Sequence, residues 1–108
     1  MERSFMYKLE DTLYIQMSGR IEVESANAFT QEILERLDSL TCPLLVFDLK
    51  DLQGINSQIL GVIVKVWQKA KGQGKTCRVL ARRRGIELFR IARLESIVEI
   101  YPLDDISD

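Results

Sequence analysis

The sequence contains no histidine, and its only cysteines are Cys42 and Cys77. Histidine is the commonest general base in enzymes, so its absence excludes a Ser-His-Asp triad and a Cys-His pair. Two cysteines are too few for a disulfide framework, and without histidine their spacing matches no zinc site. We expect both thiols to be reduced and buried, and the sequence predicts no metal site and no cofactor.

The sequence also lacks a long apolar segment and an excess of charge of one sign. No apolar run approaches the roughly 20 residues that span a bilayer, and the charged residues 1–11 lack the apolar stretch of a signal peptide. Fifteen Lys and Arg residues face sixteen Asp and Glu residues, for a net charge of -1. Nucleic-acid-binding proteins usually carry a clear basic excess. We therefore expect a cytoplasmic protein with no membrane insertion and no direct nucleic-acid partner.

What the sequence does contain is a regular alternation of strand and helix patterns. The 108 residues suit one domain spanning 1–108, and the 46% of hydrophobic residues suffice for a core. Alternate residues from Leu13 to Met17 are apolar, which is typical of a strand with one buried face. Between Ala26 and Leu40 apolar residues recur every three or four positions, as in an amphipathic helix, and Ser25 is its expected N-cap. The apolar run 44–49, LLVFDL, is typical of a strand buried on both faces.

The whole chain reads as eight such segments. In order, they are strands at 5–9 and 12–17, a helix at 24–40, a strand at 44–49, a helix at 58–71, a strand at 75–82, a helix at 85–94 and a strand at 97–103, with an acidic segment at 103–108 that could add one helical turn. Strands that alternate with helices imply parallel pairing through crossovers. The sequence thus predicts an α/β fold: a small mixed sheet that begins with an antiparallel hairpin and has helices mainly on one face.

Three short patterns contain residue types that can bind ligands. Residues 72–76, GQGKT, resemble the end of a phosphate-binding loop, but Lys69 replaces the first glycine and the segment leads from helix to strand, so it predicts a helix end. The basic run Arg82–Arg84 predicts either a solvated surface or a patch for an anion or an acidic partner. Asp48 and Asp51 could bind Mg²⁺ or transfer protons, yet no third ligand lies near them in sequence. A small-ligand or enzyme domain that uses Asp48, Asp51 and Arg82–Arg84 is therefore one alternative, with little support from the sequence.

Asn56 and Ser57 stand at the start of the predicted helix 58–71. Both are favoured N-cap residues, so one of them must close the helix start. Ser57 could do only this, or it could also be phosphorylated. A phosphoserine at a helix N-terminus faces unpaired N–H groups and the positive end of the helix dipole, so the fold tolerates it. A docked partner, by contrast, would meet about two new negative charges.

Two segments resemble a known family. MSGRIEVESA at 17–26 resembles a typical opening of the STAS domain, and LLVFDLKDLQGINSQILGVIVKVWQKAKGQGK at 44–75 is similar to its central block. Among STAS proteins, the chain resembles the bacterial anti-sigma factor antagonists. The resemblance runs from about residue 7 to residue 106. The family's central block has a buried strand ending in Asp-Leu, here Asp48-Leu49, a helix start of the form Asp-Ser-Ser/Thr-Gly, and then Leu-Gly-Val, here residues 60–62.

The resemblance places Ser57 at the family's phosphorylated serine. The chain departs from the motif on both sides, because Asn56 replaces the Asp while Gln58 and Ile59 replace the second Ser/Thr and the Gly. Without that glycine, a bulky apolar side chain stands where a partner's backbone would approach.

The function that the resemblance implies is an anti-sigma factor antagonist, a binding module that is not itself an enzyme. Its partners would be an anti-sigma factor that is also a serine kinase, and a phosphatase that restores binding after phosphorylation of Ser57. The residues expected to bind the partner are Arg20, Glu22, Asn56, Gln58 and Ile59. The alternative is a STAS scaffold without phosphorylation, in another regulatory or transport-associated complex. A second copy of the chain is also a possible partner, which would give a homodimer.

Overall fold

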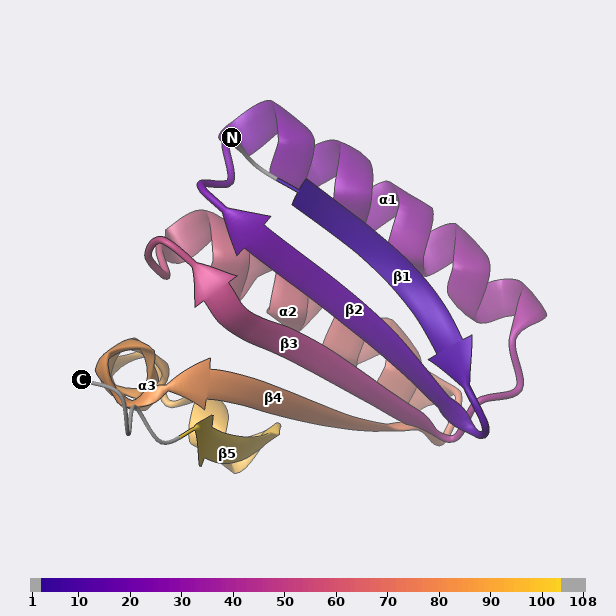
Figure 1. Cartoon of the computed structure of the whole chain (residues 1–108). Coiled ribbons are helices and arrows are strands. Elements are labelled where there is room, and N and C mark those ends of the chain that lie inside the picture. Colours follow the sequence, from indigo (N-terminus) through magenta and orange to yellow (C-terminus); the bar gives the residue numbers. More distant parts are fainter. Residues whose placement is uncertain (1–2, 104–108) are drawn as a thin grey trace.

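Five strands form one mixed sheet in the computed structural model, which describes residues 3–103 (Figure 1). The elements are β1 (Arg3–Leu9), β2 (Thr12–Gly19), α1 (Val23–Ser39), β3 (Leu44–Leu52), α2 (Ser57–Gly72), β4 (Thr76–Arg82), α3 (Arg83–Ile91), a 3-10 turn (Leu94–Ser96) and β5 (Glu99–Leu103). The strands lie in the order β1-β2-β3-β4-β5. β1 pairs antiparallel with β2, and all later neighbours are parallel. The predicted element order and the opening hairpin are confirmed.

The helices cover one face of this sheet. α1 and α2 lie side by side behind β1 to β3, and α3 lies at the end of β4 (Figure 1). The predicted arrangement, with helices mainly on one face, is therefore confirmed. Among residues 3–103, none of the helices reaches the length and hydropathy that a membrane crossing requires.

The core lies between the sheet and α1 and α2. Its centre is a row of three paired residues, Ile15, Phe47 and Val79, on β2, β3 and β4, each with no exposed surface. Alternation along a strand points every second side chain to the same face, so the neighbours two positions away are buried as well. Opposite them stand the apolar stripes of the two helices, Ala26, Phe29, Ile33 and Leu37 from α1, and Ile59, Val62, Ile63 and Val66 from α2.

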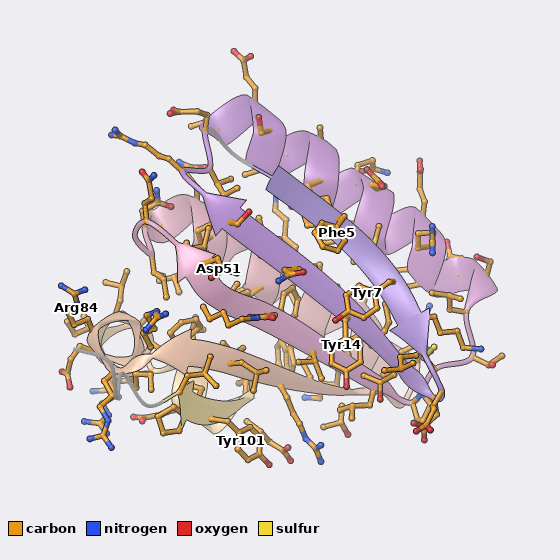
Figure 2. The ribbon with its side chains drawn as sticks, in the orientation of Figure 1. Phe5, Tyr7, Tyr14, Asp51, Arg84 and Tyr101 are labelled. Carbon is orange, nitrogen blue, oxygen red and sulfur yellow. The ribbon has the colours of Figure 1, made fainter. Side chains whose placement is uncertain are left out.

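On the other face of the sheet, no helix formed by residues 3–103 lies over the strands. Figure 2 shows Phe5, Tyr7 and Tyr14 on this face, turned away from α1 and α2. The ring centroids of Tyr7 and Tyr14 lie 5.1 Å apart in a stacked pair, and those of Phe5 and Tyr7 lie 6.0 Å apart. Val46 and Asp48 on β3 are also buried on this face, which confirms the prediction for 44–49. The Asp48 carboxylate accepts hydrogen bonds from Gln16 Nε2 on β2, at 3.5 Å, and from Lys50 Nζ on β3, at 2.6 Å.

Several element boundaries differ from the sequence prediction. α1 begins at Val23, and Glu22 rather than Ser25 is its N-cap. The first helical hydrogen bond runs from Ala26 N to Glu22 O, at 2.8 Å. Ser25 therefore already lies within the first turn of the helix and cannot be its N-cap. β3 continues to Leu52 because its parallel pairing with β2 reaches Gly19.

α3 is displaced toward the N-terminus. It begins at Arg83, directly after β4, and ends at Ile91. Arg93 then adopts a left-handed backbone with φ 58°, which an α-helix cannot accommodate. Leu94 therefore belongs to the 3-10 turn rather than to α3. The helical turn predicted within 103–108 lies outside the described residues, except for Leu103, which ends β5.

Both cysteines are free and buried, as predicted. Burial raises the pKa of the Cys77 thiol to about 11. The thiolate is the nucleophilic form of cysteine. Since Cys77 stays protonated near neutral pH, it acts as a small core residue.

Candidate functional site

The candidate site lies at the carboxyl ends of β2, β3 and β4. These strands are parallel, so the loops that follow them meet at one end of the sheet (Figure 1). This is the end at which open α/β sheets generally bind their ligands. A hydrogen bond of 2.8 Å from Gln53 N to Gly19 O ties the loop after β3 to the end of β2. The Arg20–Glu22 loop is thereby held beside the loop that leads to α2.

Asn56 is the N-cap of α2. Its backbone is extended, with φ -129°, and its side-chain Oδ1 accepts a hydrogen bond of 3.1 Å from Ile59 N. Ser57 is the first residue of the helix and is exposed. Within residues 3–103 its hydroxyl forms no hydrogen bond with the protein. Of the two predicted capping residues, Asn56 therefore caps the helix, and the Ser57 hydroxyl takes no part in the cap.

Replacing Asn56 by alanine is expected to lower the free energy of unfolding by about 1 kcal/mol, because the Ile59 amide loses its acceptor. Ser57→Ala removes no hydrogen bond within the described chain and should leave stability nearly unchanged. Urea denaturation of the two variants measures the difference. Equal losses in both would show that Ser57 shares the capping function.

Ile59 lies in the core, with no exposed surface. The prediction that Ile59 contacts a partner is therefore wrong. The reason is its place on the helix: it belongs to the stripe that also contains Ile63 and Val66 and faces the sheet. Its neighbour Gln58 keeps part of its surface exposed and stays a predicted contact residue.

Arg20 and Glu22 project into solvent from the loop before α1. Arg20 Nε lies 4.0 Å from Glu22 Oε1, and the two side chains are 80% and 71% exposed. An exposed pair of this kind contributes little to stability, so both side chains are available to a partner. Ile21 between them is buried and anchors the loop. Ile21 was not among the predicted site residues, although an apolar residue between two charged ones was the available signal.

The start of α3 also belongs to this end of the molecule. Arg82 Nε donates a hydrogen bond of 3.0 Å to Lys50 O, which links β4 to β3. Gly85 lies against Ile55, and a Cβ atom at Gly85 would lie only 2.4 Å from Ile55 Cδ1. This contact between α3 and the loop before α2 was not predicted. A glycine at the start of the predicted helix 85–94 was the only local signal of a close approach.

The Asp48 carboxylate is engaged in an ion pair. Lys50 Nζ lies 2.6 Å from Asp48 Oδ2, and the Lys50 amide donates to Asp48 Oδ1 at 3.2 Å. The hydrogen bond to Asp48 raises the pKa of Lys50. Asp51 is exposed at the end of β3 (Figure 2). Within residues 3–103, no three Asp, Glu, Cys or His side chains converge on a point that could hold a metal ion.

The GQGKT segment ends α2, as its pattern predicted. The amides of Gln73 and Lys75 both donate to Ala70 O, at 3.0 and 2.9 Å, and Gly74 has φ 75°. Such a left-handed glycine is a common way to end a helix. Lys75 Nζ donates to Leu40 O and Cys42 O, at 3.1 and 2.7 Å. This lysine therefore joins the end of α2 to the segment between α1 and β3.

Comparison with known proteins shows the family of the chain and proteins that share its fold. A sequence model of the STAS domain matches residues 5–103. A Thermotoga neapolitana protein named as a candidate anti-sigma factor antagonist is 26% identical over 106 residues, which cover 96% of this chain and 92% of the relative. An anti-sigma factor antagonist from Mycobacterium paratuberculosis has a similar crystal structure, with a TM-score of 0.82, 22% identity and coverage of 97% of this chain and 89% of the other. SpoIIAA of Bacillus, in its phosphorylated form, matches with a TM-score of 0.77, 9% identity and coverage of 97% and 95%.

Proposed function

Since the chain belongs to the STAS domain family, we propose that it is an anti-sigma factor antagonist. In this role it is a cytoplasmic regulatory module that sequesters an anti-sigma factor and releases it when Ser57 is phosphorylated. The chain itself catalyses no reaction, and the ATP is used by the partner, which is both anti-sigma factor and serine kinase. A phosphatase returns the module to its binding form.

One observation carries the proposal: the Ser57 hydroxyl is exposed at the first residue of α2, while Asn56 closes the helix. A phosphate can therefore be added without removing the cap. It would lie at the amide end of α2, where unpaired N–H groups and the helix dipole stabilise negative charge. The phosphate should therefore leave the stability of the fold unchanged, while its negative charge alters the binding of a protein docked there.

The proposed docking surface consists of Arg20 and Glu22 from the loop before α1, and Asn56 and Gln58 at the start of α2. The first two side chains are almost fully exposed, and the hydrogen bond from Gln53 N to Gly19 O keeps the two loops adjacent. The names of similar proteins support the proposed role of the chain, since two of them are named as antagonists or candidates and the Bacillus protein has been solved in a phosphorylated form.

Incubation with the host's anti-sigma kinase and ATP tests the proposal. We expect one phosphate per chain on Ser57, none on Ser57→Ala, and an unchanged yield on Ser39→Ala. Ser39 is a suitable control because it is also exposed but lies at the last residue of α1. Phosphate on another residue, or none with an anti-sigma factor that binds the chain, would remove the switch.

A constitutive scaffold is the second candidate. It is favoured by the side chains beside Ser57, because Gln58 and Ile59 replace the Ser/Thr and Gly of the family motif and Ile59 is built into the core. Such a module would join regulatory proteins, or two copies of itself, whatever the state of Ser57.

A further inference from the structure

A cavity of about 290 Å³ lies between the loop before α2 and the first turns of α3. Its apolar lining comes from Leu49, Leu52, Ile55 and Leu88, and two arginines, Arg82 and Arg84, stand in its wall. We refer to it as the arginine cavity. The volume is at the small end of the range for ligand pockets. It suits one or two side chains of a protein better than a complete small molecule.

Among residues 3–103, the charged side chains that line the arginine cavity have one sign, since they are two arginines and no carboxylate. Arg82 is fixed in place by its hydrogen bond to Lys50 O. Arg84, the second residue of α3, is exposed (Figure 2) and forms no ion pair or hydrogen bond within residues 3–103. Glu87, one turn further along α3, pairs with Arg90 at 3.2 Å instead. The guanidinium of Arg84 is therefore open to a carboxylate from another molecule.

The arginine cavity is continuous with the proposed docking surface. Ile55 lines it and directly precedes Asn56 and Ser57 in the loop. The contact of Ile55 with Gly85 keeps this loop against α3. A protein docked on the start of α2 can thus reach the cavity without any rearrangement of the chain.

We infer that the arginine cavity receives an apolar side chain next to an acidic one from the partner protein. The apolar side chain would be buried against Leu52, Ile55 and Leu88, and the carboxylate would bind Arg84. Arginine suits this role because its planar guanidinium binds a carboxylate with two parallel hydrogen bonds. The apolar lining favours a protein segment over a bare phosphate chain. The inference rests on the proposed function, since it describes the partner of the same surface.

The inference also explains how phosphorylation of Ser57 would release the partner. An acidic partner segment held by Arg84 would lie at the same end of the sheet as the phosphate. The phosphate adds about two negative charges, so it would repel the acidic segment. Raising the salt concentration should weaken partner binding for the same reason, because surface charges are then screened.

The first test needs no natural partner. The ¹⁵N-labelled full chain is titrated with the peptide acetyl-Leu-Asp-Leu-Glu-amide and, as a control, with acetyl-Leu-Lys-Leu-Lys-amide. We expect saturable amide shifts at Gly54, Ile55, Gly85 and Leu88 with the acidic peptide only. Arg84→Glu should weaken this binding at least tenfold. Arg36→Glu carries the same charge change on the exposed side of α1 and should behave as the wild type.

No saturable shift at these residues, equal shifts with the lysine peptide, or unchanged binding by Arg84→Glu would overturn the inference. Equal shifts with inorganic phosphate alone would also overturn it, since the cavity would then be an anion site. Calorimetry with the anti-sigma factor separates this inference from the proposed function. If Ser57→Asp weakens binding and Arg84→Glu does not, the cavity is not a contact although the function holds. If the acidic peptide binds as expected and the anti-sigma factor does not bind at all, the proposed function fails instead.

Discussion

Phe47→Ala is expected to lower the free energy of unfolding by about 3–5 kcal/mol. Phe47 has no exposed surface and lies on the central strand β3, where it pairs with Ile15 of β2 and Val79 of β4. Its removal forfeits the burial of a large ring and leaves a cavity beneath α1 and α2 that the surrounding side chains fill only in part. A domain of this size has a total stability of about 5–15 kcal/mol. The loss is therefore a large fraction of the total, and the urea concentration at the midpoint of unfolding should fall markedly.

Phe5→Ala is the matched control, because it removes the same ring from the open face of the sheet, where Phe5 is 43% exposed. Its loss should be much smaller and should come mainly from the stacking of Phe5 on Tyr7, which is worth about 0.5–1.5 kcal/mol. Urea denaturation followed by circular dichroism measures both variants. Similar losses would mean that the open face contributes as much as the face under the helices, which would contradict the two-layer arrangement.

Ser57→Asp is expected to weaken binding of the anti-sigma factor at least tenfold, or by about 1.4 kcal/mol. The substitution adds a negative charge at the exposed start of α2 and leaves the Asn56 cap intact. A carboxylate is favourable at a helix N-terminus, so the stability of the chain itself should not fall. Loss of binding without loss of stability is the behaviour expected of a switch. Isothermal titration calorimetry gives the affinity, and thermal unfolding gives the stability.

Two controls accompany this experiment. Ser57→Ala should bind as tightly as the wild type, because it adds no charge and removes no hydrogen bond. Ser39→Asp puts the same charge on the last residue of α1 and should leave the affinity unchanged. An affinity that Ser57→Asp does not alter would favour the constitutive scaffold over the phosphorylation switch.

Local patterns in the sequence determined the order of the elements. The alternation around Ile15, the three-to-four-residue spacing through Phe29 and Ile33, and the glycines after α2 each reflect backbone geometry within a few residues. The same holds for the start of α2, because an N-cap depends on one polar side chain and the amides that follow it. These features could be predicted because each depends on neighbours in the chain.

Tertiary structure decided the rest. Pairing of β3 with β2 extended the strand to Leu52, and packing of α2 on the sheet turned Ile59 into the core, where the motif alone suggested a contact residue. Ile55 meets Gly85 only because β4 and α3 return to the end of the sheet where α2 begins. Contacts between residues so distant along the chain leave no periodic pattern in the sequence. The chain by itself thus specified which elements form and where Ser57 stands, while the fold determined which side chains surround it and which of them remain open to another protein.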